Sequence, residues 1–298
     1  EPMGPDYVRG MCHDIEDPTF DATAIATNPR AQVRPIHRPP REPADRLPHC
    51  AWTVVIDDSH PVATSIPALG VIAATNAATW ELAPIDPDDD GRSDYSGPLL
   101  SDFDFAALSH SALVRVADEV CLQMHLLNLS FALAVRARAG DDTALATSIR
   151  TKQLTGIAGV AAERIRRALN LPADADGLER VLALHPLLNP AGYVRAEIGG
   201  GRLHVSASPA HDDGAWIALC SPGSAESSAP VQAIATAVDP HLVARLTCTG
   251  TDWTAEFEHS DTALPECVEV QITKVSRGAN FEFQPRRSLP LSLAAKKN

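Results

Sequence analysis

Hydrophobic residues in the middle of the chain recur with the period of a helix. Residues 120–135 are apolar on every side of a helical wheel, and such a helix is expected to be buried. The helix is expected to run from Asp104 to Ala139, with Ser101 or Asp102 as its cap, and to end at Gly140. A second helix over Thr143–Leu169 then predicts an antiparallel helical hairpin with a buried core.

Other segments in the first two thirds of the chain fit shorter elements. Residues 52–56 are expected to form a buried strand, and residues 66–80 and 177–184 to form helices. Residues 86–98, between the expected helix at 66–80 and the long helix, are expected to form a loop. Its acidic run, Asp86–Gly91, lacks the alternating acids and closing Glu of a calcium-binding EF-hand loop.

Near residue 190 the hydrophobic period changes from about 3.6 residues to about two, as expected for strands. Three hairpins follow: 193–198 with 202–206, 244–248 with 253–258, and 267–275 with 280–283. Gly199, Gly200 and Gly201 are expected to form the first turn, and helices are expected at 214–219 and 230–238. The pattern predicts an antiparallel sheet with helices on one face.

The fold class is therefore α+β: a helical domain with a long buried helical hairpin, followed by an antiparallel sheet domain. We expect a proline-rich N-terminal arm over residues 1–50, a mainly helical domain over 51–190, the α+β domain over 191–290, and a tail over 291–298. The arm contains nine prolines, so neither a helix nor a paired strand is expected to run far in it. Its basic stretch, residues 34–43, is expected to lie across an acidic surface or another subunit.

Charge and composition narrow the functional classes. A formal charge of −13 argues against binding to a phosphate backbone, so no nucleic acid partner is expected. The apolar run at 120–135 is shorter than a membrane span and contains Gln123, His125 and Asn128, so no membrane is expected. Six widely spaced cysteines without a C-x-x-C pair favour reduced thiols and a cytoplasmic location.

Polar residues on the long helix form the candidate catalytic site. Asp118 and His125 are seven positions apart and share a helical face, while Arg115 and Glu119 lie on or beside it. A histidine beside carboxylates in a low-dielectric site can act as a general base. The same residues also fit a structural interpretation, in which Arg115 pairs with an acid and His125 bonds to backbone.

Metal and cofactor motifs are weak. Cys12, His13, His49 and Cys50 offer zinc ligands, but adjacent ligands do not have the usual zinc spacing, and whether they bind a metal is left open. The Glu-x-x-His spacing occurs once, at Glu256 and His259 in an expected strand, whereas a di-iron site needs it on two helices. No nucleophile elbow, Walker or dinucleotide motif occurs in the sequence. The cofactor is therefore unknown.

Two functional hypotheses follow. The first is a non-catalytic accessory or interaction protein that engages a partner subunit, or forms a homo-oligomer, through the proline-rich arm and helical domain. The alternative is an enzyme that acts on a small molecule, with His125 as the base and Asp118 or Glu119 orienting it.

Overall fold

The computed structural model describes residues 4–63, 67–96, 103–220 and 225–276, and its fold is α+β. The chain divides into two compact units, residues 1–67 and 68–298. The boundary expected near residue 190 falls inside the second unit. The strand expected at 280–283, the tail at 291–298 and the helix caps expected at Ser101 and Asp102 lie outside the described residues.

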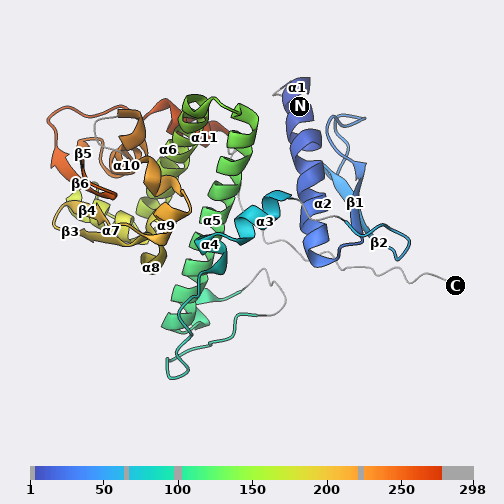
Figure 1. Ribbon diagram of the computed structural model, residues 1–298, viewed down its shortest axis with the longest axis horizontal. Coiled ribbons are helices and arrows are strands. Elements are labelled where there is room, and N and C mark those ends of the chain that lie inside the picture. Colours follow the sequence, from blue (N-terminus) through green and yellow to red (C-terminus); the bar gives the residue numbers. More distant parts are fainter. Residues whose placement is uncertain (1–3, 64–66, 97–102, 221–224, 277–298) are drawn as a thin grey trace. The chain divides into compact units, whose positions relative to one another are not determined.

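The first unit has more regular structure than its prolines led us to expect. It contains three helical segments and a two-stranded antiparallel sheet: α1 (Pro5–Arg9), the π-helical η1 (Gly10–Ile15), α2 (Glu16–Thr27), β1 (Ala31–His37) and β2 (Ala51–Ile56) (Figure 1). The expectation of an irregular arm was wrong for these residues. Pro5 lies in the first turn of α1, where a missing N–H costs nothing, and the wider π-helical turn precedes Pro18.

Strand β2 was predicted, but its burial was not found. Ala31 pairs with Ile56 at one end of the β1–β2 ladder, and the register shifts after Pro35. Val54 is 62% exposed, and Val55 and Ile56 are exposed as well. The basic side chains of this region pair within the unit, since Arg34 and Arg38 form ion pairs with Asp21 and Asp17 of α2.

The second unit combines a helical layer with a sheet. Its helical segments, in chain order, are α3 (Pro67–Ala73), α4 (Asn76–Thr79), η2 (Phe105–Ala107), α5 (His110–Ala139), α6 (Thr143–Ala168), α7 (Ala175–Leu184), η3 (Pro186–Leu188), α8 (Ala191–Val194), α9 (Pro209–Asp212), η4 (Trp216–Leu219), α10 (Ala225–Val238) and α11 (Val268–Ser276). Its strands are β3 (Ala196–Gly199), β4 (Arg202–Val205), β5 (Leu242–Thr249) and β6 (Asp252–His259).

The predicted helical hairpin is confirmed, although its first helix starts later than expected. The Ser109 hydroxyl accepts a hydrogen bond from the Ala112 backbone N–H, so α5 begins at His110. Gly140, with φ of +58°, ends it, and the Asp142 carboxylate caps α6 by accepting from the Leu145 N–H. α5 and α6 therefore lie side by side, as Figure 1 shows.

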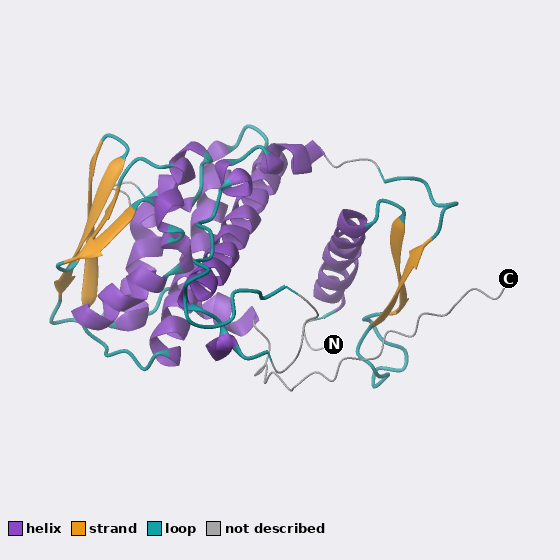
Figure 2. Ribbon diagram, turned by 90° about the horizontal axis from the view of Figure 1, so that it is seen from below, coloured by secondary structure: helices purple, strands orange, loops and turns teal. Residues whose placement is uncertain are grey.

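The four-stranded sheet has the order β3-β4-β6-β5 and is antiparallel throughout. The second predicted hairpin is confirmed. The first is confirmed only from Ala196 onward, because Tyr193 and Val194 belong to helix α8, and Gly200 and Gly201 form its turn with positive φ. Helices α7 and α10 contact the sheet, and Figure 2 shows the helices on one of its faces. The shared core runs from Ala77 through α5 and α6 to the sheet residue Ala255, so helices and sheet bury one another.

The third predicted hairpin was wrong in its first half, because residues 268–276 form the helix α11. Alternating Val268, Val270 and Ile272 resemble a strand in sequence. Of these, only Val270 is buried, against α6, and the other two are exposed. Tertiary packing against α6 has overridden the local pattern.

Helix α5 is buried on one face only, so the expectation of burial on every side was wrong for the other face. Leu122, His125 and Leu129 are buried, whereas Val120 is 57% and Leu127 72% exposed. Among the described residues, α5 is the one helix long and apolar enough to cross a membrane by length and composition. Core helices of soluble proteins also have this length and apolar composition, so one such helix does not establish a membrane span.

Close packing of α6 gives the first testable prediction. A Cβ atom on Gly156 would lie 2.8 Å from the Glu269 carbonyl oxygen of α11 and would also meet the Thr273 hydroxyl. We expect Gly156→Ala to lower the free energy of unfolding by about 1–3 kcal/mol, because the backbone of α11 has to move. Urea denaturation measures the change.

Gly70→Ala is the matched control, since Gly70 is also helical and nothing lies within 4 Å of its missing Cβ. This substitution should leave stability unchanged or raise it by up to about 1 kcal/mol. Equal effects of the two substitutions would contradict the close α6–α11 contact.

Candidate functional site

The four residues of the predicted catalytic site divide into two groups along α5. Arg115, Asp118 and Glu119 lie near its N-terminal end and are partly exposed, whereas His125 is 1% exposed. Seven residues of helix separate Asp118 from His125, which is about 10 Å along the axis. The hydrogen bonds and ion pairs found among the described residues do not connect His125 to Arg115, Asp118 or Glu119.

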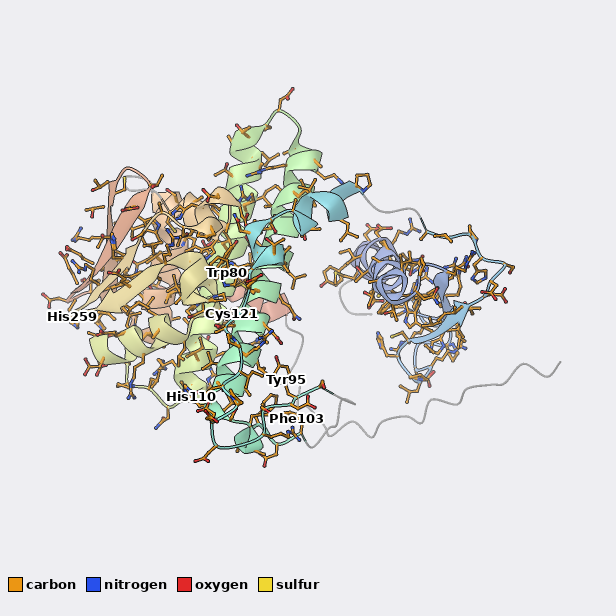
Figure 3. The ribbon with its side chains drawn as sticks, turned by 60° about the horizontal axis from the view of Figure 1, so that its bottom comes forward. Trp80, Tyr95, Phe103, His110, Cys121 and His259 are labelled. Carbon is orange, nitrogen blue, oxygen red and sulfur yellow. The ribbon has the colours of Figure 1, made fainter. Side chains whose placement is uncertain are left out.

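Arg115 and Glu119 attach the preceding loop to the helix. Arg115 Nε lies 3.3 Å from Glu119 Oε1, and its guanidinium also donates to the Ala83 carbonyl. The Tyr95 hydroxyl donates to Glu119 Oε1 at 2.7 Å. Burial, followed by this bond to a carboxylate, raises the pKa of Tyr95, so the phenol stays protonated. Figure 3 labels Tyr95 and also Cys121, which follows Glu119 on α5.

Asp118 lies close to Cys121 rather than to the histidine. Burial raises the pKa of the Asp118 carboxyl. Burial, with a smaller contribution from the negative charge of Asp118, raises the pKa of Cys121 to about 11. This cysteine is therefore a neutral thiol at pH 7 and a poor nucleophile.

His125 is fixed inside the core. Its Nε2 lies 2.9 Å from the Asn189 carbonyl oxygen, and since a carbonyl only accepts, Nε2 carries the proton. Its ring packs edge-on against Tyr193, with 5.0 Å between centroids. Nδ1 is buried and has no hydrogen-bond partner among the described residues. Burial lowers the pKa of His125 to about 4, so the ring is neutral at pH 7.

A second buried histidine and an aspartate extend this polar group, and neither was singled out from the sequence. His185 is fully buried, with Nε2 3.1 Å from the Ala158 carbonyl and Nδ1 accepting from the Leu187 N–H. The Tyr193 hydroxyl donates to Asp213 at 2.9 Å, and Asp213 also accepts the backbone N–H groups of Asn76 and Ala77. These contacts join segments distant in sequence, which explains why spacing alone did not reveal them.

Chemically, the arrangement around His125 is that of a neutral imidazole with one open acceptor atom, enclosed by protein. The Nδ1 lone pair would be the atom that accepts a proton from a substrate. Of the partly exposed carboxylates near it in sequence, Glu119 binds Tyr95 and Arg115, and Asp118 raises the pKa of Cys121. Catalysis by His125, Asp118, Glu119 and Arg115 remains a prediction.

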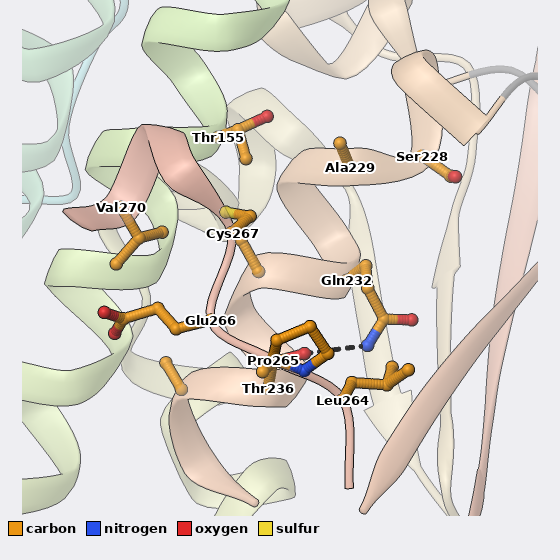
Figure 4. A pocket seen from close by; sticks show the side chains of 12 residues that line it. Thr155, Ser228, Ala229, Gln232, Thr236, Leu264, Pro265, Glu266, Cys267 and Val270 are labelled. Carbon is orange, nitrogen blue, oxygen red and sulfur yellow. Dashed lines mark hydrogen bonds between the residues drawn. The ribbon is translucent and has the colours of Figure 1, made fainter. Parts of the chain in front are cut away.

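A cavity of about 390 Å³ lies elsewhere in the second unit, between α6, α10 and the segment before α11. Its walls include Thr155, Gln232 and Cys267, as Figure 4 shows. The Gln232 amide donates to the Thr236 hydroxyl and the Leu242 carbonyl, and its oxygen accepts from the Ala244 N–H. Gln232 therefore connects α10 to β5, and the cavity walls are otherwise mainly apolar.

A second apolar hollow, of about 360 Å³, lies between α5 and α6. Met124, Leu127 and Phe131 form its α5 side, and Ile157 and Ala161 belong to its α6 side. Neither this hollow nor the larger cavity is lined by Arg115, Asp118, Glu119 or His125.

Among the described residues, no group of three or more His, Cys, Asp or Glu side chains could hold a metal ion. His13, one of the four candidate ligands of the N-terminal region, lies 3.0 Å from the Pro39 carbonyl through Nε2 and 3.1 Å from Arg38 through Nδ1. Both of its ring nitrogens are thus engaged by protein groups.

Comparison of the chain with family models, with curated proteins and with solved structures found no match. The proposed function therefore rests on the chain's own residues.

The buried histidines predict a dependence of stability on pH. Burial lowers the pKa of both His125 and His185 to about 4, against about 6.5 in an unfolded chain. Between these values the unfolded state binds more protons, so the free energy of unfolding falls as the pH falls below 6.5. At pH 5 the loss should be about 2 kcal/mol for each histidine.

Urea denaturation at pH 5, 6 and 7.5 measures this loss. His125→Gln keeps an amide donor for the Asn189 carbonyl but does not titrate, so its stability should fall by about 2 kcal/mol less over the same interval. Parallel pH curves for this variant and the original chain would show that His125 is not held neutral by burial.

Proposed function

We propose that this chain is a non-catalytic interaction protein that engages a protein partner through its proline-rich N-terminal region and its helical domain. The observation that carries the proposal is the distribution of apolar side chains in the first unit. Its buried apolar residues are few and small, whereas its large apolar residues are mostly exposed. The exposed ones are Tyr7, Met11, Ile15, Ile36, Leu47, Val54, Val55, Ile56 and Val62.

The buried apolar side chains of the first unit, among the described residues, are Val8, Ala31 and Val33. Units of fewer than about 70 residues rarely gain enough stability from such a small core without further support. Exposed apolar surface of this kind is typical of a surface that another protein covers. A partner would therefore supply the burial that the unit's own core lacks.

The two-stranded sheet offers a second feature suited to a partner. A two-stranded sheet has two edges, and exposed edge strands readily pair with another chain. Val54 and Ile56 lie on one face of β2, and Leu47, in the proline-rich loop before it, is 81% exposed. A protein that contacts this loop and strand would bury apolar side chains and satisfy backbone groups together.

A cytoplasmic location is part of the proposal. The six cysteines, all in the described part of the chain, are thiols rather than disulfides. Thiols spread through a chain in this way are typical of a reducing compartment.

The partner surface can be tested by substitution with charge. We expect the double variant Leu47→Glu/Val54→Glu to lose a stoichiometric protein partner by at least about tenfold, because apolar anchors dominate such contacts. The tagged full-length chain is purified from the cells that make it, and retained proteins are quantified by native mass spectrometry.

Ala44→Glu/Thr53→Glu is the matched control, since both residues are exposed neighbours in the same loop and strand and the added charge is the same. This control should retain the partner. Recovery of the original chain without any protein partner, or equal retention by both double variants, would contradict the proposal.

A small-molecule enzyme is the second candidate, and the buried Nδ1 of His125 favours it because such an atom is an acceptor without a partner among the described residues. Native mass spectrometry of the purified chain addresses it directly. A retained small molecule that His125→Gln no longer holds, in a variant that still folds, would support the enzyme. A chain that retains no small molecule, or retains it equally in the variant, would count against it.

A further inference from the structure

The exposed side of α5 carries an apolar stripe with the spacing of a coiled coil. The stripe alternates steps of four and three residues over three heptads, and we call its members the α5 seam: Leu113, Ala117, Val120, Met124, Leu127, Phe131 and Ala134. Helices with this repeat pair through that stripe with another helix. Leu122 and Leu129, on another face of α5, pack into the core of the unit.

Much of the seam is accessible, although Met124 also packs against the core of the unit. Leu113, Val120 and Leu127 are exposed, while Met124 and Phe131 are half-buried beside the hollow shared with α6. On α6, Leu145 and Ile149 are exposed as well. Both helices of the hairpin therefore carry exposed apolar side chains, a feature of surfaces that another protein covers.

We propose that the α5 seam pairs with the same seam of a second copy of this chain, with the two helices antiparallel. The inference rests on the proposed function, since it identifies the partner of the helical domain.

The sequence of the seam fits an antiparallel pair about a twofold axis between His125 and Leu126. In that register three kinds of layer form between seam residues, and Leu113 at the end of the seam lies opposite Arg138 of the other copy. Met124 faces Leu127 of the other copy, Val120 faces Phe131, and Ala117 faces Ala134. Beside these layers, Gln123 of one copy lies opposite Ser130 of the other, so no like charges meet in the middle of the interface.

Charges at the two ends of α5 select the antiparallel direction. The last turn contains Arg136 and Arg138, and a parallel pair would place these cations beside their own copies. At the first turn, the Asp89 carboxylate accepts a hydrogen bond from the Ser111 backbone N–H at 2.7 Å. The backbone N–H of Asp86 donates to the Ser111 hydroxyl. Antiparallel pairing brings the basic end of one helix to this acidic loop of the other. The two helix dipoles then run in opposite directions, which is the favourable arrangement.

The polar groups near the seam favour a protein partner over a lipid surface. Gln123 and Ser130 are exposed on α5 next to the seam residues Met124 and Phe131, and the partly exposed Glu119 precedes Val120. Charged residues at these positions are costly within a bilayer. Between two protein copies they remain at the solvent-exposed rim, which is usually polar.

Sedimentation equilibrium of the full-length chain tests the interface. The original chain should be a dimer, and Leu127→Glu should weaken the dimer by about a hundredfold or more, because it places two charges against the Met124 layers. Leu184→Glu is the control. Leu184 is an exposed leucine at the end of α7 and does not belong to the seam, so this variant should remain dimeric.

Disulfide trapping tests the direction of pairing. In a background in which the exposed Cys248 is replaced by Ser, Ala117→Cys/Ala134→Cys should form a cross-linked dimer under mild oxidation, and either single cysteine should not. Efficient cross-linking through a single cysteine would indicate a parallel pair and overturn the proposal.

Other outcomes separate this inference from the proposed function. A monomeric original chain, or an unchanged dimer in Leu127→Glu, overturns the self-pairing of α5 whatever partner the first unit binds. If Leu127→Glu abolishes retention of a different protein, the helical domain binds that protein and the second copy is excluded as its partner. If a monomeric chain floats with phosphatidylglycerol vesicles and Leu127→Glu does not, the seam binds lipid and the proposal is overturned.

Discussion

The packing of α6 is the constraint on which the second unit depends. This helix lies against α5, α7, α10 and α11, and its buried positions include Leu154, Ala158 and Ala162. Gly156 and Gly159 let the backbones of α10 and α11 approach where a side chain would collide. Because α10 also contacts β5, the position of the sheet follows from the surface of α6. Helical and sheet regions therefore form one core rather than two.

Much of this fold could be predicted from local signals, and the failures have physical causes. Caps at Asp142 and Gly140 marked the helical hairpin, and consecutive glycines marked the β3–β4 turn. The helices before residue 28 were missed because proline was treated as a breaker even where it lies in a first turn. Residues 268–276 alternate as a strand does, but α6 holds them as a helix. Local periodicity does not include the partner against which a segment packs.

For the candidate site, sequence spacing predicted a shared helical face but not what lies opposite it. Arg115 and Glu119 do meet, with Tyr95 added from a loop that spacing did not connect to them. His125 instead belongs with Tyr193, Asn189 and, through Tyr193, Asp213. The apolar residues of α5, which the sequence pattern predicts to be buried on every side, divide between two faces. The exposed face has the heptad spacing. One helix thus serves its own core and the surface proposed for a second copy.

Asp213 also joins two segments that are made far apart during synthesis. Its carboxylate holds the first N–H groups of α4, more than 130 residues earlier in the chain. Helix α10, the main neighbour of α6, likewise emerges from the ribosome long after it. A nascent chain that ends before residue 213 therefore leaves uncovered the side of α6 that packs on α10 and α11, a state that attracts chaperones.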